Sequence, residues 1–407
     1  RVSGKGPPTA GAAMAASAAA RGLSAARSAA LLARRLAPRR GWEAVERQRR
    51  GCAASSHARF APEDLRGFMG GAFKALGLPT ADATLVARCL VQADLRAQAG
   101  HGVQRLPVYA RRLRAGVVNA TPDIRVERTA PSAAAVHGDD GMGFVVATRA
   151  TEEAISLARS QGLGLAGVRR STHFGCSAHY VLQALEADML SLVFTNSSPA
   201  LPPWGGARAL LGASPFAAGA PAGTRHPLVL DMSTTVIARG KLRLAAQRGE
   251  PIPPGVGLDR DGRPTRDGME AFHGVTLPFG GAKGAAISLL MDVLSGALTG
   301  AGFAGGVRSL YNDVAGHQDV GHFILCMRPD LFLPSVDEFK ARMDHLVDTL
   351  KAQPRAEGVE EVMMPGEPES LAEAERSKSG VPLQPDVVES LQAEGASLGL
   401  TFPQPIA

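Results

Sequence analysis

The sequence predicts an α/β protein, and three observations support this fold class. Short apolar runs typical of buried strands alternate with longer helical patterns after residue 130. With 407 residues, 45% of them hydrophobic and 20% charged, the chain can bury a core without covalent support. Its 4 cysteines are far apart and form no Cys-x-x-Cys pair, so we expect neither a disulfide framework nor a zinc site.

Residues 1–58 are expected to form a leader and a mitochondrial transit peptide. The segment from Met14 to Trp42 is rich in Ala, Ser, Leu and Arg and contains no acidic residue. This composition is typical of a transit peptide, whereas arginines interrupt every candidate apolar region of a secretory signal. The matrix is therefore the predicted location, with the cytoplasm as the alternative.

The positive charge of the chain lies in that segment, and the rest is mildly acidic. The first 50 residues hold eleven Lys or Arg and two acids, which leaves 33 basic and 36 acidic side chains for the remainder. A basic footprint for nucleic acid is therefore missing. The longest apolar stretch, residues 285–304, is interrupted by Asp292 and by glycines, so no membrane span is expected.

Residues 59–130 are expected to form a helical part. Pro62, Glu63 and Asp64 have the composition of a helix N-terminus, and apolar residues at roughly helical spacing follow to Leu76. Two further helices are predicted over residues 82–96 and 103–115.

The region 131–330 is predicted to be an α/β part that binds cofactor and substrate, and 331–407 a helical C-terminal part. In the former we expect strands at 133–137, 163–168, 190–195, 216–218, 228–230 and 322–328, and helices at 145–160, 177–187, 234–248 and 283–298. In the latter, helices are predicted at 335–352, 369–378 and 386–397.

A Gly-x-Gly-x-x-Gly pattern spans Gly162 to Gly167, but its context excludes a dinucleotide fingerprint. That fingerprint follows a strand and begins a helix, so that the pyrophosphate meets the helix N-terminus. Here a predicted helix comes first and a strand follows. The pattern is therefore interpreted as a helix end and a glycine-rich entry to a strand.

Three side chains are candidates for catalysis. His101 and Arg105 are four residues apart, which on a helix places imidazole and guanidinium on one face. Arginine can hold a carboxylate while histidine moves a hydroxyl proton, although a solvated surface pair is the alternative. His173 follows the strand 163–168, where polar residues often line the ligand crevice of an α/β sheet or cap the next helix.

Two polar segments stand at predicted helix starts, and one of them is a candidate for contacts with a phosphate. Asp231 to Thr234 end a strand, and their side chains are helix caps by default. Lys283 lies in a glycine-rich turn before an apolar helix, where backbone amides and an ammonium group favour a phosphate. A plain loop is the alternative, and no metal site is expected.

Taken in order, these segments resemble the malate/L-lactate dehydrogenase family that lacks the usual Rossmann domain. The resemblance runs from about Phe60 to Leu400. The matching stretches include Ala93–Arg96, His101-Gly102, Arg105–Pro107, Asp140-Gly, Gly143, His173–Gly175, Thr195–Ser197, Pro203–Gly206, Leu230–Ser233, Ala238–Lys241, Leu277-Pro, Gly281, Lys283-Gly284 and Pro365–Glu367.

The resemblance implies the family's α/β fold, with a helical N-terminal part and a mixed-sheet part that binds the cofactor. It implies that His101 is the catalytic acid/base, that Arg105 binds substrate, and that His173 belongs to the active-site region. It further implies NAD, or NADP, as the cofactor and a homodimer or larger assembly. The implied cofactor contacts are Pro227, Leu228, Val229, Leu230, Asp231, Met232, Ser233, Ala282, Lys283, Gly366, Glu367 and Pro368.

The expected reaction is hydride transfer between nicotinamide and an L-2-hydroxy acid or 2-oxo acid such as malate, lactate or sulfolactate. The alternatives are an NADPH-dependent reductase of cyclic imino acids and a non-catalytic dinucleotide-binding scaffold. The chain departs from the family pattern where Gln98 replaces a histidine, Gly100 a serine and Ala282 a histidine. These departures concern substrate identity, because they fall beside the substrate or the nicotinamide.

Overall fold

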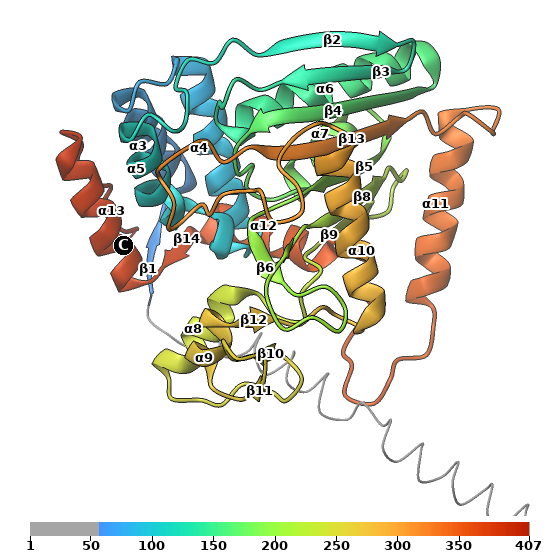
Figure 1. Ribbon diagram of the computed structural model, residues 1–407. Coiled ribbons are helices and arrows are strands. Elements are labelled where there is room, and N and C mark those ends of the chain that lie inside the picture. The colour runs from blue at the N-terminus through green and yellow to red at the C-terminus, as the bar shows by residue number, and fades with distance from the viewer. Residues whose placement is uncertain (1–56, 407) are drawn as a thin grey trace, which may run out of the picture. The chain divides into compact units, whose positions relative to one another are not determined.

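The computed structural model describes residues 57–406 of the chain (Figure 1). Nearly all of the predicted transit peptide therefore lies outside the described residues. Residues 57–353 and 362–406 belong to one compact unit. Residues 354–361 lie outside it and form a loop in which Arg355 donates to the carbonyl of Glu360 at 2.7 Å.

A seven-stranded mixed sheet is the centre of the compact unit, with strand order β2-β3-β4-β13-β5-β8-β9. Only β3 and β4 are parallel neighbours; the other pairs in this sheet are antiparallel. The strands are β2 (Arg125–Ala130), β3 (Ala133–His137), β4 (Leu163–Ser171), β5 (Leu190–Thr195), β8 (Phe216–Ala220), β9 (Leu228–Met232) and β13 (Val320–Met327). The predicted α/β class is confirmed, although β2, whose six residues are all exposed, has no apolar pattern that would have predicted it.

Helices cover both faces of this sheet. On one face Ala166 and Val168 of β4 are buried under α6 (Gly143–Gln161), and α7 (Ala178–Glu186) covers β5, β8 and β9 beside it. The intervening Gly167 points to Thr299, on the side of α10 (Ala282–Asp292) and the π-helical turn Val293–Ala297. Because side chains alternate along a strand, the two helical layers lie on opposite faces. Gly162 ends α6 at a φ of 82°, in agreement with the interpretation of the Gly162–Gly167 pattern.

The N-terminal helices form a second core with segments from the C-terminus. They are α3 (Pro62–Ala75), α4 (Thr80–Leu95) and α5 (Leu106–Arg114), and they pack with β1 (Ala58–Phe60), β14 (Val381–Leu383) and α13 (Pro385–Ser397). The rings of Phe60 and Phe68 both meet Phe402 edge to face, with centroids 5.2 and 5.0 Å apart. The end of the chain therefore completes the core that its beginning starts.

A small substructure joins β9 to α10. It contains α8 (Arg239–Gln247), α9 (Gly268–His273) and a sheet of β10 (Gly257–Leu258), β11 (Pro264–Thr265) and β12 (Val275–Thr276). The predicted helix 234–248 was too long, because α8 begins only at Arg239. Residues 234–236 instead pair with the 277–279 turn through the backbone, which leaves them unable to start a helix.

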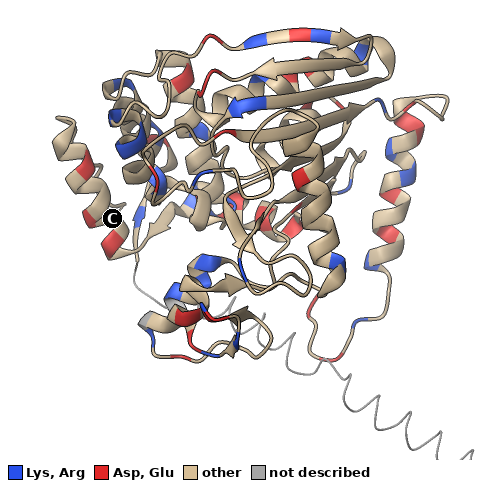
Figure 2. Cartoon of the chain, viewed as in Figure 1, with Lys and Arg blue, Asp and Glu red and all other residues tan. Residues whose placement is uncertain are grey.

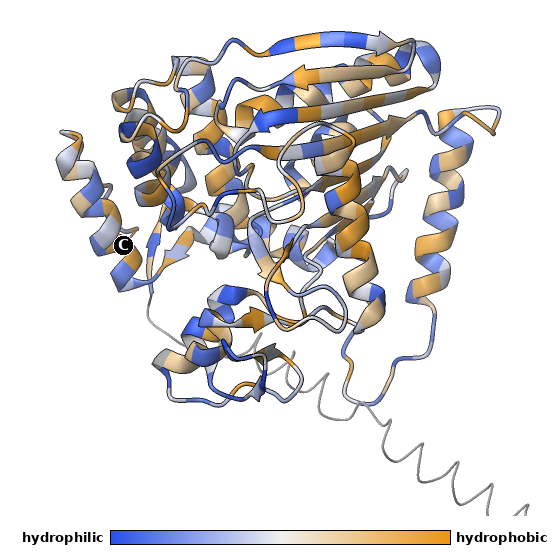
Figure 3. Cartoon of the chain, viewed as in Figure 1, coloured by the Kyte–Doolittle hydropathy of each residue, from blue (hydrophilic) through white to orange (hydrophobic). Residues whose placement is uncertain are grey.

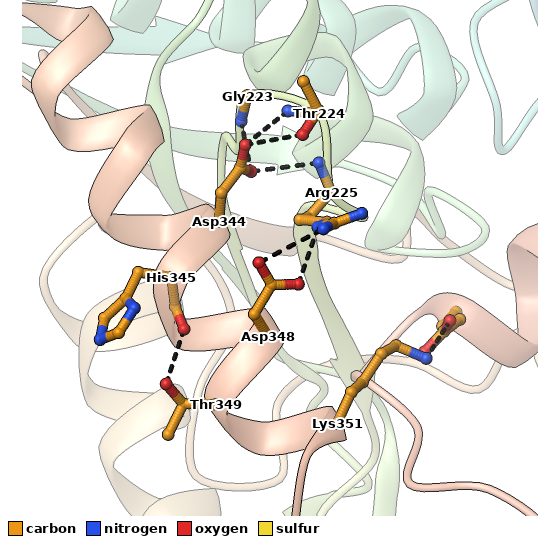
Figure 4. Close-up of polar contacts among 9 residues, drawn as sticks. Gly223, Thr224, Arg225, Asp344, His345, Asp348, Thr349 and Lys351 are labelled. Carbon is orange, nitrogen blue, oxygen red and sulfur yellow. Dashed lines mark hydrogen bonds and ion pairs between the residues drawn. The ribbon is translucent and has the colours of Figure 1, made fainter.

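The remaining elements are α11 (Val336–Lys351), α12 (Glu367–Ser379) and a hairpin of β6 (Pro199–Leu201) and β7 (Leu211–Gly212). Helix α11 is fixed to the turn between β8 and β9 (Figure 4). The Asp344 carboxylate accepts from the backbone N–H groups of residues 223, 224 and 225, and these bonds lower its pKa to about 2. Arg225 in turn pairs with Asp348 at 2.8 Å. These contacts fix where β9 begins.

Candidate active site

The candidate site begins where α4 ends. The chain leaves α4 at Leu95 and passes through two 3₁₀ turns, Ala99–His101 and Val103–Arg105, before α5 begins. The spacing of His101 and Arg105 predicted that they share one face of a helix, and this prediction was wrong. Each instead ends its own short turn, and the two remain close enough for the Arg105 charge to act on His101.

A buried carboxylate holds these turns in place. Asp94, near the end of α4, is 3% exposed and accepts from the backbone N–H of Val103 at 2.7 Å. A Cβ on Gly102 would lie 2.1 Å from the carboxylate, so only glycine fits there. Burial raises the pKa of Asp94 to about 7, which the Val103 hydrogen bond opposes. No role was predicted for Asp94, although it lies within the stretch 93–96 that matches the family.

The three predicted catalytic side chains come together. The His101 and His173 rings are stacked, with centroids 5.6 Å apart and planes 6° from parallel. The hydroxyl of Tyr109, from α5, lies 2.7 Å from His173 Nδ1, and the His173 backbone N–H donates to Gln318 Oε1 at 3.1 Å. His173 is thus fixed between α5 and the segment that precedes β13.

The imidazole of His101 is held neutral. Burial, and secondarily the Arg105 charge, lowers its pKa to about 4. Its Nδ1 atom is buried and has no hydrogen-bond partner among the described residues. Because no described residue occupies it, Nδ1 can form a hydrogen bond with a bound ligand. A neutral imidazole there can accept a proton from that ligand.

The Arg105 guanidinium is held by backbone and side chain. Its Nε donates to the carbonyl of Gly100 at 2.6 Å, and Nη1 donates to the hydroxyl of Tyr311. Its central carbon lies 5.0 Å from the centroid of the Tyr311 ring. Tyr311 is in a loop far along the chain, so no local pattern could have predicted this contact.

A histidine of the central strand supports the site from behind. His322 of β13 is fully buried; its Nδ1 lies 2.8 Å from Thr195 Oγ1, and its Nε2 lies 2.8 Å from Ser171 Oγ. Its ring also stacks on Phe174, next to His173. His322 was predicted only as part of a strand, although a polar residue within an apolar strand is a candidate site residue.

Two of the three predicted cofactor-binding stretches meet at the edge strand β9. The backbone N–H of Val229 donates to the carbonyl of Pro365 at 3.1 Å, and Gly366 adopts a left-handed φ of 87° against Val229. Glu367 then pairs with Lys351 of α11 at 2.6 Å. The stretches 227–233 and 366–368 therefore share one border of the sheet.

The third stretch lies beyond the end of β9. Thr234, after Ser233, accepts from the N–H of Phe279, and α10 begins three residues later at Ala282. Ala282 and Lys283 are thus in the first turn of α10, whose backbone N–H groups have no partners within the helix. Such amides together with an ammonium group suit a pyrophosphate, so the residues present fit a dinucleotide.

Asp231 has a different role from the helix cap that its position suggested. Its carboxylate accepts from the backbone N–H of Ala178 at 2.8 Å and so supports the start of α7. Burial raises its pKa to about 6, against the effect of that hydrogen bond. The contact ties β9 to the segment that carries His173. Among the described residues no group of three potential metal ligands occurs, and no helix is long and apolar enough to cross a bilayer.

Comparison with known proteins identifies the family. A family model described as malate/L-lactate dehydrogenase matches residues 60–392. L-sulfolactate dehydrogenase of Methanothermobacter thermautotrophicus is 36% identical over 340 residues, which cover 82% of this chain and 95% of that protein. The sulfolactate dehydrogenase structure from Methanocaldococcus jannaschii superposes with a TM-score of 0.80 at 34% identity, covering 84% of this chain and 98% of that one.

Other relatives differ in cofactor and in substrate. The (2R)-3-sulfolactate dehydrogenase (NADP(+)) of Chromohalobacter salexigens is 36% identical, over 80% of this chain and 95% of its own length. The ureidoglycolate dehydrogenase (NAD(+)) of Escherichia coli K12 is 33% identical, over 77% and 89%. A delta1-piperideine-2-carboxylate reductase structure from Pseudomonas syringae superposes with a TM-score of 0.75 at 28% identity, over 83% and 99%.

We expect Gly102→Ala to destabilise the protein by about 1–3 kcal/mol, because the new methyl group overlaps the buried Asp94 carboxylate. Gly100→Ala is the matched control, since a Cβ there meets nothing within 4 Å. Differential scanning calorimetry of the two variants measures the effect. Equal Tm values for both would show that Gly102 does not need to be glycine.

Proposed function

We propose chemical roles for His101, Arg105 and Lys283 of this chain, which belongs to the malate/L-lactate dehydrogenase family. It is an NAD(P)-dependent dehydrogenase that acts on 2-hydroxy acids. The observation that supports the roles is the neutral, half-buried His101, whose buried Nδ1 has no partner among the described residues, close to the Arg105 guanidinium. The His101 imidazole can accept a hydroxyl proton, and the Arg105 guanidinium can bind a carboxylate on the neighbouring carbon.

In the oxidation direction, Arg105 binds the substrate carboxylate and so orients the 2-hydroxyl towards His101. His101 accepts the hydroxyl proton as the carbonyl forms. In the reduction direction the protonated imidazole returns that proton to the carbonyl oxygen. His173 lies parallel to His101 and restricts the plane in which the His101 ring can lie. Fixing two groups in this way lowers the entropic cost of reaching the transition state.

The cofactor supplies the hydride chemistry at its nicotinamide ring when it is bound. We assign its binding to β9, the Gly366–Pro368 turn and the start of α10. Lys283 and the first-turn amides of α10 carry the positive charge that a pyrophosphate requires. Asp231 joins this border to the start of α7, which follows His173 closely in the chain.

Substrate identity is proposed at the level of the functional group. Arg105 recognises a carboxylate, and His101 exchanges a proton with an oxygen or a nitrogen on the adjacent carbon. Malate, lactate and sulfolactate all satisfy this description, as do cyclic imino acids. We favour the hydroxy acids, because the sulfolactate dehydrogenases are more similar in sequence than the imino-acid reductase.

His101→Ala is expected to lower kcat by about 10²–10⁴-fold while NADH still binds, because the proton acceptor is lost and the cofactor contacts remain. The assay follows NADH and NADPH absorbance with oxaloacetate, pyruvate, 3-sulfopyruvate, diketogulonate and piperideine-2-carboxylate. His345→Ala is the control, since His345 is exposed on α11. Near-normal turnover of His101→Ala would overturn the assigned role, and reaction only with the cyclic imine would make the protein an imino-acid reductase.

The pH dependence of hydroxy-acid oxidation is expected to follow His101. Because burial and Arg105 lower its pKa to about 4, kcat/KM should stay level down to pH 5 and fall as pH drops through about 4. A carboxylate bound to Arg105 offsets the charge that lowers this pKa, so the fall in kcat should occur at higher pH. Initial rates between pH 4 and 8 test this. A fall in kcat/KM centred at 6.5 would contradict a buried neutral base.

We also propose that the protein acts as a homodimer or a larger homo-oligomer. Helix α10 and the π-helical turn are coloured mostly as hydrophobic, with charged residues only near the two ends of α10 (Figures 2 and 3). Leu289, Leu290, Val293 and Leu298 are 53, 50, 47 and 63% exposed. An apolar surface of this kind is typical of an interface with another chain, and a second copy would cover it beside the cofactor border.

Light scattering should therefore give a mass of at least two chains. Leu290→Glu places a charge on the proposed interface and should lower that mass, whereas Leu371→Glu, at an exposed leucine of α12, should not. A wild-type protein with the mass of one chain at micromolar concentration would refute the proposal.

A further inference from the structure

The loop between the π-helical turn and β13 contacts two parts of the site: Arg105 with the helix α5, and the segment that carries His173. The buried guanidinium of Arg112 donates to the carbonyls of Asp313 at 2.5 Å and Ser309 at 3.4 Å. Arg111 donates to the carbonyl of Tyr311, and Gln318 accepts from the His173 backbone. Because the carbonyls of residues 309, 311 and 313 all accept hydrogen bonds, the backbone on both sides of Tyr311 is held in place and presents the Tyr311 side chain in one position.

The Tyr311 side chain contacts Arg105 in two ways. Its hydroxyl accepts from Arg105 Nη1, and its ring lies against the face of the guanidinium at 5.0 Å. The Gly100 carbonyl accepts from Nε on another edge. A planar group held on one face and at two N–H groups cannot rotate freely about its side-chain bonds.

The remaining N–H groups of Arg105 are available for a ligand. A guanidinium has five N–H groups, of which Gly100 and Tyr311 accept two. No described residue accepts from Nη2 in a hydrogen bond, so Nη2 and the second N–H of Nη1 can bind the two oxygens of a carboxylate side by side. Such a bidentate contact depends on the plane of the guanidinium.

We propose that Tyr311 is a positioning residue, which orients the Arg105 guanidinium for the substrate carboxylate. This inference rests on the proposed function of Arg105. It makes Tyr311 a determinant of substrate affinity rather than of proton or hydride transfer. Without the hydroxyl and the ring, the substrate must order Arg105 on binding, and affinity falls by the cost of that ordering.

The test compares Tyr311→Phe, which keeps the ring, with Tyr311→Leu, which loses ring and hydroxyl. The substrate is oxaloacetate, pyruvate or 3-sulfopyruvate, whichever gives the highest kcat/KM with wild type. KM for this acid should rise about three- to tenfold in Tyr311→Phe and further in Tyr311→Leu. The kcat value should stay within about twofold, and KM for NADH should not change, because Tyr311 contacts neither the base nor the cofactor border.

Asn312→Ala is the matched control, because Asn312 is the exposed neighbour in the same loop and its own contact uses only the backbone. It should leave all constants unchanged, and Tm values of all variants should match wild type. Unchanged KM in both Tyr311 variants overturns the inference. A lowered KM also overturns it, since the Tyr311 hydroxyl would then occupy the place of the carboxylate.

A variant of Arg105, alone and combined with Tyr311→Phe, tests the role of Tyr311 separately from the proposed role of Arg105. Arg105→Leu should raise KM for the acid, and Tyr311→Phe added to Arg105→Leu should have no further effect. If Arg105→Leu leaves KM unchanged, the proposed role of Arg105 is wrong. If Arg105→Leu raises KM and Tyr311→Phe alone does not, only the role of Tyr311 is wrong.

Discussion

The bond between the Asp94 carboxylate and the Val103 backbone is the interaction on which the site depends. A carboxylate is removed from water there, which costs free energy that few hydrogen bonds recover completely. In return, the end of α4 and the start of α5 are joined across two 3₁₀ turns. His101 and Arg105 extend from those turns, and their separation follows from this single contact. The positions of the proton-transfer and carboxylate-binding groups thus depend on a buried carboxyl group that lies outside the turns themselves.

Local sequence patterns predicted most of the helices and the longer strands, but not how the strands pair. The helices α3, α4 and α6 and the strands β4, β5 and β13 are apolar at the spacing that their geometry requires, so their positions were readable. The exposed strand β2 and the two-residue strands of the small sheet lack such a pattern. Their position is decided by pairing with segments that are distant in the chain, which a local pattern cannot contain.

The site shows the same division. His101, Arg105 and His173 were identified because their residue types and neighbours suit the chemistry, and the structure brings them together. Tyr311 and Gln318 were missed, since each acts through a contact with a residue more than a hundred positions away. The helical face proposed for His101 and Arg105 was wrong in its details, because Asp94 and Gly102 replace the helix by two tighter turns. The residue types and their neighbours in the sequence therefore predicted which side chains form the site. The orientation of those side chains depends on tertiary contacts, which the sequence pattern does not show.

The place of β13 in the sheet has a consequence for synthesis of the chain. β4 and β5 are separated by only α7 in sequence, yet β13 lies between them and is translated more than a hundred residues later. Until the ribosome has passed Met327, both strands have open edges, and His322 cannot yet reach Ser171 and Thr195. Open strand edges are where nascent chains aggregate. The two halves of the sheet thus remain separate, each with an open edge, until β13 is made and joins them.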